Sequence, residues 1–582
     1  MRKTKIVCTI GPASNSEEKL HSLIYAGMNV ARFNFSHGTH ESHKATFDIL
    51  DRLRTELHLP VATLLDTKGP EIRLGTFKGG MAELHTGSHF TLTTEDCQGD
   101  ETRAYINYAG LVNDVKAGDT ILFNDGAIEL RVINVYQGDI ACEILNDGIV
   151  SDRKGVNVPG IRLSMPYVSE KDRADIIFGA QTGFDFIAAS FVRCAEDILQ
   201  VRQVLERQGN HSVRIIAKIE NAEGVANIDE ILRVSDGIMV ARGDMGVEVP
   251  LEDVPVFQKI LIKKCYNTGK MVITATQMLE SMMHNPRPTR AEAADVANAI
   301  YDGTSAIMLS GETAAGDYPI ETVKTMAAIA ERTERDIDYR KRFFTRVDER
   351  VADITNAISH ATCTTAYDLG ASAIITVTWS GTTARMLSKY RPDIPIIACT
   401  HFDHTYRQLA LSWGVSPLKV DVKEDTDELF AHALDMAKKA GYVENGNVVV
   451  ITAGVPLGIN GTTNLLKVQV VGDILVSGMG VNRNNAIGRI CVAHNEEEAL
   501  TTFNDGDILV IPETSNKLLP VLKKASGIIT EVGGMNSHAA IVGMTLDIPV
   551  IVFCENATSV LKSSTVVEID ASNGTVSNCK TE

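Results

Sequence analysis

Eight short apolar runs alternate with helical segments over the first 340 residues, and this alternation constrains the fold more than any other feature. The runs cover residues 5–10, 30–34, 61–66, 186–189, 214–218, 237–241, 271–274 and 306–309. Amphipathic helices are indicated in most of the gaps, for example at 17–26, 197–208 and 292–301. Short buried strands separated by helices form parallel sheets. Eight such units predict an α/β fold, specifically a (β/α)8 barrel.

Polar side chains follow seven of the eight runs at the carboxyl end, the face on which a barrel of this type carries its chemistry. They are Arg32 and Asn34, Asp66, Ser190, Lys218 and Glu220, Arg242 and Asp244, Thr276 and Gln277, and Ser310 and Glu312. One polar strand end alone would mean little. The repetition predicts an active site on that face of the barrel.

The stretch 215–249 carries the most informative charges. Lys218 and Glu220 are two residues apart at the end of one strand and therefore lie on the same face, and Asp244 follows the next strand. Two carboxylates and an ammonium facing one crevice suit a divalent cation bound through oxygen beside an anion. The alternative is a buried structural salt bridge. Gly243 and Gly246 favour a ligand site, because glycine lets backbone amides approach a ligand closely.

A different pattern interrupts the barrel between residues 70 and 166. Alternating segments are joined by Phe123-Asn-Asp-Gly126 and Leu145-Asn-Asp-Gly148, and Asp-Gly steps of this kind predict β-hairpins. We therefore expect a small β-barrel domain at 70–166, inserted as a lid into a barrel formed by 1–69 and 167–339.

Residues 340–473 are predicted to form a second α/β domain. Its strands are expected at 373–378, 394–399, 415–420, 447–452 and 466–471. The segment Thr378-Trp-Ser380-Gly381-Thr382-Thr383 joins a strand to a helix, so hydroxyls and amides can form an anion cradle at a helix N-terminus. A second Gly-rich loop covers 453–464. Either loop alone could be a plain turn; together they favour a phosphorylated effector.

The tail, 474–582, repeats short strands near 489–492, 508–511, 527–530 and 550–552 and is predicted to be a further α/β domain. It contains Gly533-Gly534-Met-Asn536-Ser537-His538.

Composition limits the functional classes. A chain of 582 residues is long enough for three or four domains. Its formal net charge of −18 argues against nucleic acid or an anionic membrane as partner. No apolar run is long enough to span a bilayer, and residues 1–5 lead directly into a strand. The ten cysteines form no Cys-x-x-Cys pair. We expect a cytoplasmic protein.

Six motifs resemble those of the pyruvate kinase family and occur in the family's order. They are Arg32-Phe-Asn-Phe-Ser-His-Gly38, Asp66-Thr-Lys-Gly-Pro-Glu-Ile-Arg73, Lys218-Ile-Glu-Asn221, Arg242-Gly-Asp-Met-Gly246, the run from Ala275-Thr-Gln-Met-Leu-Glu-Ser281 to Pro286-Arg-Pro-Thr-Arg290, and Leu309-Ser-Gly-Glu-Thr313. The resemblance extends to about residue 473. It implies transfer of the phosphoryl group of phosphoenolpyruvate to ADP, giving pyruvate and ATP.

The resemblance also implies a role for each site residue. Arg32, Lys218 and Thr276 would be catalytic, with Gly243 and Asp244 also contacting the substrate. Glu220 and Asp244 would hold Mg2+ (or Mn2+). The remaining assignments are Asn34, Ser36, Asp66 and Thr67 for K+; Asn34, His37, Arg73, Lys154 and Ser310 for the nucleotide; and Thr378, Ser380, Gly381, Thr382 and Thr383 for an effector, a sugar monophosphate or AMP.

Several alternatives stay open at this point. Arg32 could pair with Asp66 as a structural bridge, and Ser36 and Thr67 could simply cap strand ends. Another barrel enzyme acting on a keto acid, such as an aldolase or lyase, could use the same metal pair. A catalytically silent effector-binding protein is the third class, but it would be expected to have lost Lys218, Glu220 or Asp244.

The tail resembles the swivelling phosphohistidine domain of phosphoenolpyruvate-utilising enzymes, which some bacterial pyruvate kinases carry. The usual Thr-Ser-His reads Asn536-Ser537-His538 here, so we expect His538 not to carry phosphate. Two further expectations come from the family alone. Members are usually homotetramers, and an acid at the position of Glu71 accompanies K+ dependence, whereas a lysine there replaces the cation.

Overall fold

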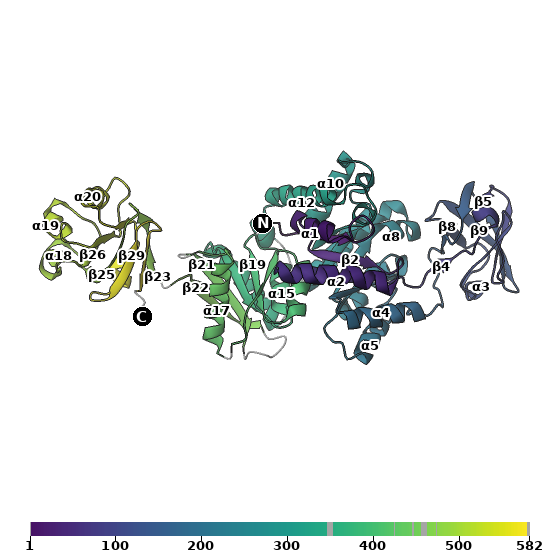
Figure 1. The fold of residues 1–582 in the computed structure, drawn as a ribbon, viewed down its shortest axis with the longest axis horizontal. Coiled ribbons are helices and arrows are strands. Elements are labelled where there is room, and N and C mark those ends of the chain that lie inside the picture. Colours follow the sequence, from purple (N-terminus) through teal and green to yellow (C-terminus); the bar gives the residue numbers. More distant parts are fainter. Residues whose placement is uncertain are drawn as a thin grey trace. The chain divides into compact units, whose positions relative to one another are not determined.

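The computed structural model describes residues 2–345, 353–423, 425–444, 447–455, 463–472 and 474–578 (Figure 1). It divides into two compact units. The first holds Met1–Cys363, Thr376–Thr426 and Ala453–Leu465, and the second holds Thr364–Ile375, Asp427–Thr452 and Leu466–Glu582. Within the described residues, no helix is long and apolar enough to cross a membrane.

Eight parallel strands close into a barrel, as the alternating pattern predicts. Around the barrel their order is β1 (Lys5–Thr9), β17 (Ala306–Leu309), β16 (Met271–Ala275), β15 (Gly237–Ala241), β14 (Arg214–Ile219), β13 (Phe186–Ala189), β3 (Ala62–Asp66) and β2 (Val30–Asn34). The predicted strand ranges agree with these bounds to within one residue.

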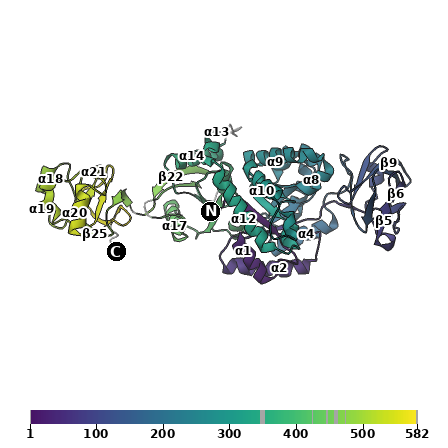
Figure 2. The same cartoon turned by 90° about the horizontal axis from the view of Figure 1, so that it is seen from above.

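Helices surround the barrel strands (Figures 1 and 2). They are α1 (Glu17–Ala26), α2 (His40–Glu56), α4 (Glu170–Thr182), α5 (Ala195–Arg207), α6 (Ala222–Ala226), α7 (Ile228–Val234), α8 (Arg242–Glu248), α9 (Val254–Thr268), α10 (Arg290–Asp302), α11 (Gly311–Ala314), α12 (Pro319–Asp336) and α13 (Tyr339–Thr345). Side-chain caps fix where several begin: Ser16, Thr39, Ser169 and Thr289 each accept a hydrogen bond from a first-turn amide.

The barrel interior is a packed core and contains no channel. Leu64, Phe186, Ile216, Met239 and Ile273 point inward from five strands and are fully buried. Close packing of this kind holds the strand ends rigidly. The polar side chains that follow those ends therefore have fixed positions.

The residues between β3 and α4 form two antiparallel-rich sheets. One has the order β4 (Ile72–Arg73), β12 (Gly155–Asn157), β8 (Thr120–Phe123), β9 (Ile128–Tyr136), β10 (Asp139–Ile144), β6 (His89–Thr93) and β7 (Arg103–Tyr105); the other pairs β11 (Gly148–Ser151) with β5 (Met81–Leu84). The short helix α3 (Leu111–Asp114) lies between β7 and β8 in the chain.

Of the two predicted hairpins, the first is confirmed and the second is wrong. Phe123 pairs with Ile128 across the first Asn-Asp-Gly turn. At the second turn, β10 pairs with β9 and β6, whereas β11 pairs with β5. The polar turn residues bond to other parts of the sheets instead. Asn146 accepts from the Glu129 amide of β9, and Asp147 accepts from the amide and hydroxyl of Thr86, between β5 and β6. Asp-Gly here redirects the chain from one sheet to another.

A five-stranded sheet has the order β20 (Val415–Lys419), β19 (Ile396–Thr400), β18 (Ala373–Val377), β21 (Val448–Gly454) and β22 (Thr463–Val470). The helices of this part of the sequence are α14 (Ile354–Asp368), α15 (Thr382–Lys389), α16 (Asp403–Gln408) and α17 (Thr426–Lys439). Most of the predicted Gly-rich loop 453–464, including Gly458, Gly461 and Thr462, lies outside the described residues.

The tail forms an eight-stranded mixed sheet. Its order is β23 (Ile474–Ser477), β30 (Thr575–Asn578), β29 (Val566–Asp570), β25 (Asn485–Val492), β26 (Ile508–Ile511), β27 (Gly527–Thr530), β28 (Val550–Val552) and β24 (Met479–Gly480). Its helices are α18 (Glu496–Thr502), α19 (Leu519–Leu522), α20 (His538–Leu546) and α21 (Ala557–Val560). Sequence reasoning found β25, β26, β27 and β28 and missed β23, β24, β29 and β30, which are two to five residues long.

Candidate active site

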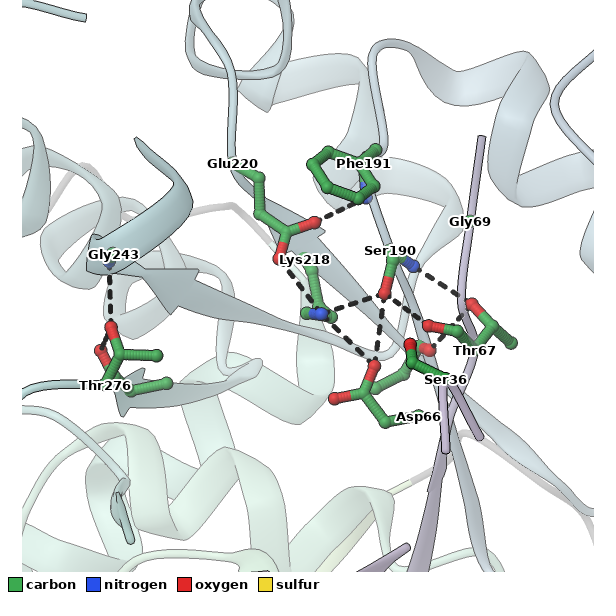
Figure 3. Close-up of polar contacts among 12 residues, drawn as sticks. Ser36, Asp66, Thr67, Gly69, Ser190, Phe191, Lys218, Glu220, Gly243 and Thr276 are labelled. Carbon is green, nitrogen blue, oxygen red and sulfur yellow. Dashed lines mark hydrogen bonds and ion pairs between the residues drawn. The ribbon is translucent and has the colours of Figure 1, made fainter. Parts of the chain in front are cut away.

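Lys218 is the centre of a buried polar network at the carboxyl ends of the barrel strands (Figure 3). Its ammonium lies 2.9 Å from Glu220 Oε1 and 3.2 Å from Asp66 Oδ1, and it donates to the Ser190 hydroxyl at 2.8 Å. These groups come from β14, β3 and the residue after β13. Three strands that are far apart in sequence therefore deliver their polar ends to one ammonium.

Arg32, in the middle of β2, extends this network. Its Nε lies 2.6 Å from Asp66 Oδ2, and its NH1 donates to the Thr9 hydroxyl at 2.9 Å. The pairing that sequence reasoning left open as a structural alternative is therefore present. This ion pair with Asp66 occupies one edge of the guanidinium and fixes the orientation of the Arg32 side chain.

Charge and burial shift the pKa values of this network. Burial alone would lower the pKa of Lys218, but the charges of Asp66 and Glu220 outweigh it and raise that pKa above its usual value. Burial would likewise raise the pKa of Asp66, and Arg32 and Lys218 hold it below its usual value. Lys218 and Asp66 are therefore both charged at neutral pH.

Glu220 behaves differently from Asp66. Burial, with a further contribution from the charge of Asp244, raises the pKa of Glu220 to about 7 although Lys218 opposes it. The Phe191 amide donates to Glu220 Oε2 at 2.6 Å, and Phe191 itself has a φ of 55°. Left-handed backbone in a non-glycine residue is costly and needs support from its surroundings. Here it aims an amide at the carboxylate.

Thr276 lies at the other side of the site, at the end of β16. Its hydroxyl accepts from the Gly243 amide at 2.8 Å and donates to the Ala275 carbonyl at 2.7 Å. Thr276 and Gln277 have φ values of 67° and 54°. Arg242 supports the turn, because it donates to the Thr276 carbonyl and forms an ion pair with Asp295 at 2.7 Å.

The four residues assigned to K+ come from the ends of β2 and β3. Asn34 accepts from the Ser36 amide at 3.1 Å, and Thr67 accepts from the Ser190 amide at 3.2 Å. Ser36, Asp66 and Thr67 lie beside one another in Figure 3. Uncharged and carboxylate oxygens gathered in this way are the donors that a hard cation uses.

The residues assigned to the nucleotide are not joined into one network. Arg73 holds Glu71 through two contacts, of 2.8 and 2.7 Å, and Lys68 lies 3.8 Å from the same carboxylate. The side chains of His37 and Lys154 form no hydrogen bond or ion pair with any described residue. The Ser310 hydroxyl is buried, and the Ser310 amide donates to Glu312 at 2.7 Å.

A cleft of about 420 Å³ adjoins the site. Glu71, Phe191, Asp244 and Glu248 are among the residues that line it. Asn157, also in the lining, donates to Glu248 at 2.8 Å and so joins the two-sheet part of the chain to α8. Sequence reasoning missed Glu248, although it lies one helical turn after Asp244. It noted Ser190 as a strand end without recognising its contact with Lys218.

The predicted effector loop joins β18 to α15, as expected, but part of its polar capacity is used internally. The Thr378 hydroxyl accepts from the Gly381 amide at 3.0 Å, so that amide is not free as the prediction assumed. Ser380 and Thr382 share a hydroxyl contact of 2.9 Å, and Thr383 contacts Thr463 at 2.7 Å. Arg385 donates to the Ser380 carbonyl at 2.9 Å.

His538 begins α20 and has a partner on each ring nitrogen. Nδ1 lies 2.9 Å from the Thr514 hydroxyl, and Nε2 lies 3.1 Å from Asn516 Oδ1. An amide oxygen only accepts, so Nε2 carries a hydrogen, and in the neutral ring the lone pair of Nδ1 faces the Thr514 hydroxyl. Both nitrogens are engaged in the described structure.

Comparison with known proteins agrees with this arrangement. The barrel-domain model of pyruvate kinase matches residues 1–323, its alpha/beta-domain model matches 356–469, and the mobile-domain model of PEP-utilising enzymes matches 503–574. The pyruvate kinase of Geobacillus stearothermophilus is 52% identical over 577 residues, which is 99% of this chain and 98% of that protein. That of Sporosarcina psychrophila is 51% identical over 580 residues, 99% of both chains.

A solved structure is also similar. The crystal structure of a pyruvate kinase from Cryptosporidium parvum superposes with a TM-score of 0.76 at 41% identity, and it covers 81% of this chain and 96% of that one. With about half of all positions identical over the full length of its relatives, and with the barrel and alpha/beta models both matched, the chain belongs to the pyruvate kinase family.

Proposed function

We propose that the network around Lys218 is where this pyruvate kinase transfers the phosphoryl group. The enzyme transfers the phosphoryl group of phosphoenolpyruvate to ADP, giving pyruvate and ATP in glycolysis. The observation that carries the assignment is the buried Lys218 ammonium, which has oxygens of three strand ends around it. Steady-state kinetics of Glu220→Gln and Asp244→Asn test it.

In this proposal Lys218 and Arg32 supply positive charge to the transferring group. The transition state of phosphoryl transfer is loose and spreads charge over the equatorial oxygens, so catalysis depends on positioning and electrostatics. Asp66 orients both cations through its two oxygens. The bond from the enol oxygen of phosphoenolpyruvate to phosphorus breaks, and one from the β-phosphate of ADP forms.

The carboxylates of Glu220 and Asp244 fit a divalent cation, Mg2+ (or Mn2+). Burial is the main cause of the raised pKa of Glu220, and the charge of Asp244 adds to it, so a cation bound between the two carboxylates would favour the charged form of Glu220. In the part of the chain that the structure describes, no group of three or more His, Cys, Asp or Glu side chains could hold a metal. Mg2+ typically accepts one or two carboxylates and completes its shell with phosphate oxygens and water. When bound, it neutralises charge on the phosphoryl and enolate oxygens.

Thr276 completes the reaction in this scheme. Loss of the phosphoryl group leaves an enolate, and a proton must reach its terminal carbon to give pyruvate. The hydroxyl of Thr276 is a poor acid, so its part is to place the enolate and a water that delivers the proton. Its bonds to the Gly243 amide and the Ala275 carbonyl hold it in position.

K+ and the nucleotide are assigned to the ends of β2, β3 and β17 and to the inserted sheets. Asn34, Ser36, Asp66 and Thr67 present oxygens for K+. His37, Arg73, Lys154 and Ser310, with Asn34, are proposed to contact ADP. The side chains of His37 and Lys154, which have no hydrogen-bond or ion-pair partner among the described residues, are available to a phosphate. The proposed assembly is a homotetramer in the cytoplasm, by analogy with the family.

Loop 378–383 is proposed to bind a phosphorylated effector, a sugar monophosphate or AMP. It precedes α15, so the positive end of the helix dipole faces the loop, and Arg385 adds a cation. A ligand at this loop can change the affinity for phosphoenolpyruvate only if it binds one conformational state of the enzyme more tightly than another. Such coupling is typically about 1–3 kcal/mol, or roughly 5- to 150-fold in affinity.

Replacing Ser380 and Thr382 together with alanine is expected to remove activation and to spare the unactivated rate. Both hydroxyls contribute to the cradle, and neither touches the barrel site. The measurement is the phosphoenolpyruvate saturation curve with and without ribose 5-phosphate or AMP. Thr268→Ala is the control, because this exposed threonine donates its hydroxyl to carbonyls of its own helix α9, outside the loop. A normal response in the double variant would locate the effector elsewhere.

His538→Ala is expected to retain near wild-type turnover. The Thr514 hydroxyl contacts Nδ1, and the proposed transfer site lies in the barrel. The variant is compared with His494→Ala, an exposed histidine of the same region, in the coupled lactate dehydrogenase assay. A large loss confined to His538→Ala, together with labelled phosphohistidine in the wild-type enzyme, would reverse this view.

A further inference from the structure

A cavity of about 290 Å³ in the first unit lies near the amino-terminal ends of the barrel strands, away from the active site. It is lined by residues of α9, the end of α10 and helix α13, together with Arg391 and Trp413. Neither the active-site residues nor loop 378–383 contribute to the lining. The volume is close to that of a small-metabolite pocket, which begins at about 300 Å³.

Positive charge dominates this cavity. Four basic side chains line it and only one carboxylate does: Lys259, Lys263, Arg342 and Arg391 against Asp302. Lys259 and Gln258 share the carboxylate of Asp302. That pairing neutralises one cation and leaves an excess of three positive charges in the lining.

Two of these cations are available to a ligand. Lys263 is exposed and forms no ion pair or hydrogen bond with any residue that the structure describes. Arg342 makes one side-chain hydrogen bond to a described residue, to the Tyr301 carbonyl at 3.2 Å. An anion between them would gain two charge-assisted contacts without displacing a carboxylate.

Aromatic rings form the inner wall. Arg391, which is 6% exposed, lies over the Trp413 ring at 4.7 Å and over the Tyr266 ring at 5.2 Å. Tyr339 packs against Trp413 with ring centroids 5.2 Å apart. The guanidinium is held in place, since it donates to the carbonyls of Ser388 and Gly303. The site therefore joins a fixed buried cation to a flat apolar surface.

We propose that this cavity is a second anion site that binds a small phosphomonoester. The phosphate would lie between Lys263 and Arg342, and the organic part would lie against Tyr266 and Tyr339. A phosphomonoester carries a charge of about −1.5 to −2 at neutral pH. It therefore balances the excess positive charge of the lining better than a ligand with a single carboxylate would. The aromatic wall favours an ester with a planar part over inorganic phosphate.

The two tryptophans of the chain make the test specific. Trp413 lines the cavity, whereas Trp379 lies in loop 378–383. In full-length Trp379→Phe enzyme the only tryptophan emission comes from Trp413. Titration with phenyl phosphate is expected to change that emission saturably, and inorganic phosphate is expected to bind more weakly.

Charge variants in the same background locate the anion. Lys263→Ala and Arg342→Ala are each expected to weaken phenyl phosphate binding about tenfold, the usual effect of losing one charge-assisted hydrogen bond. Lys264→Ala is the matched control, because this neighbouring lysine of α9 pairs with Asp229 at 2.6 Å and does not line the cavity. Equilibrium dialysis with radiolabelled phosphate counts the sites, and the Lys263→Ala/Arg342→Ala enzyme is expected to lose one.

If the Lys263→Ala/Arg342→Ala enzyme bound phosphate and phenyl phosphate with unchanged stoichiometry and affinity, the proposal would be overturned. A response seen only in Trp413→Phe enzyme, where Trp379 is the reporter, would place the anion at loop 378–383. That result would contradict the cavity site and would be consistent with effector binding at the loop. Conversely, a Trp413 response that survives Ser380→Ala/Thr382→Ala would support the cavity independently of that loop.

Discussion

Glu220→Gln is expected to lower kcat by about 100- to 1000-fold, the usual effect of removing one preorganised electrostatic group from an active site. The substitution keeps the shape of the side chain and removes one of the two charges proposed to hold the divalent cation. The same loss is expected for Asp244→Asn. Initial rates over a Mg2+ series, measured in the coupled assay at saturating phosphoenolpyruvate and ADP, give kcat and the apparent Mg2+ affinity.

The structure indicates that the fold survives Glu220→Gln. The glutamine oxygen can still accept from the Phe191 amide, and Lys218 keeps Asp66 and Ser190 as partners. Far-UV circular dichroism and the thermal midpoint should therefore stay close to wild type. Glu223→Gln is the control, because this acid three residues further along lines the same cleft but pairs with Arg162 at 3.6 Å, outside the Lys218 network. Near wild-type turnover and Mg2+ dependence in Glu220→Gln would refute the metal assignment.

Sequence periodicity was sufficient to predict the barrel because its strands are buried on both faces. Residues 186–189 and 237–241 are continuous apolar runs, and their predicted bounds coincide with β13 and β15. The last sheet was harder, because strands such as β29 alternate exposed and buried residues. A short alternating segment containing Glu568 resembles a surface loop until its neighbours are known.

The site was predictable as a set of strand ends but not as a network. Strand alternation places Lys218 and Glu220 on one face, yet nothing local in the sequence indicates that Ser190 bridges Lys218 and Asp66. That contact depends on β13 lying between β3 and β14, which is a property of the closed barrel. The same limit applies to loop 378–383, where the Thr378 hydroxyl binds its own backbone and so reduces the predicted cradle.

Activity is expected to fall by on the order of 100-fold when K+ is removed, because an electrostatic contribution to the active site is lost. Arg32 and Lys218 both pair with Asp66, and neither cation is paired with the oxygens of Asn34, Ser36 and Thr67, so in this proposal those oxygens take their cation from solution. Initial rates in tetramethylammonium buffer, with K+ added back, measure the dependence. Full activity without K+ would contradict the assignment.

Replacing Glu71 should separate the effect of charge from that of position. Glu71→Lys places a fixed ammonium near the proposed substrate phosphate and is expected to restore part of the K+-free rate. The wild-type acid pairs with Arg73, so Glu71→Lys also brings Lys68 and Arg73 into repulsion and should raise KM for ADP. Glu71→Gln is the matched control, because it releases Arg73 without adding a cation. If Glu71→Gln restored the K+-free rate as well as Glu71→Lys does, the rescue would come from the release of Arg73 and not from replacement of K+.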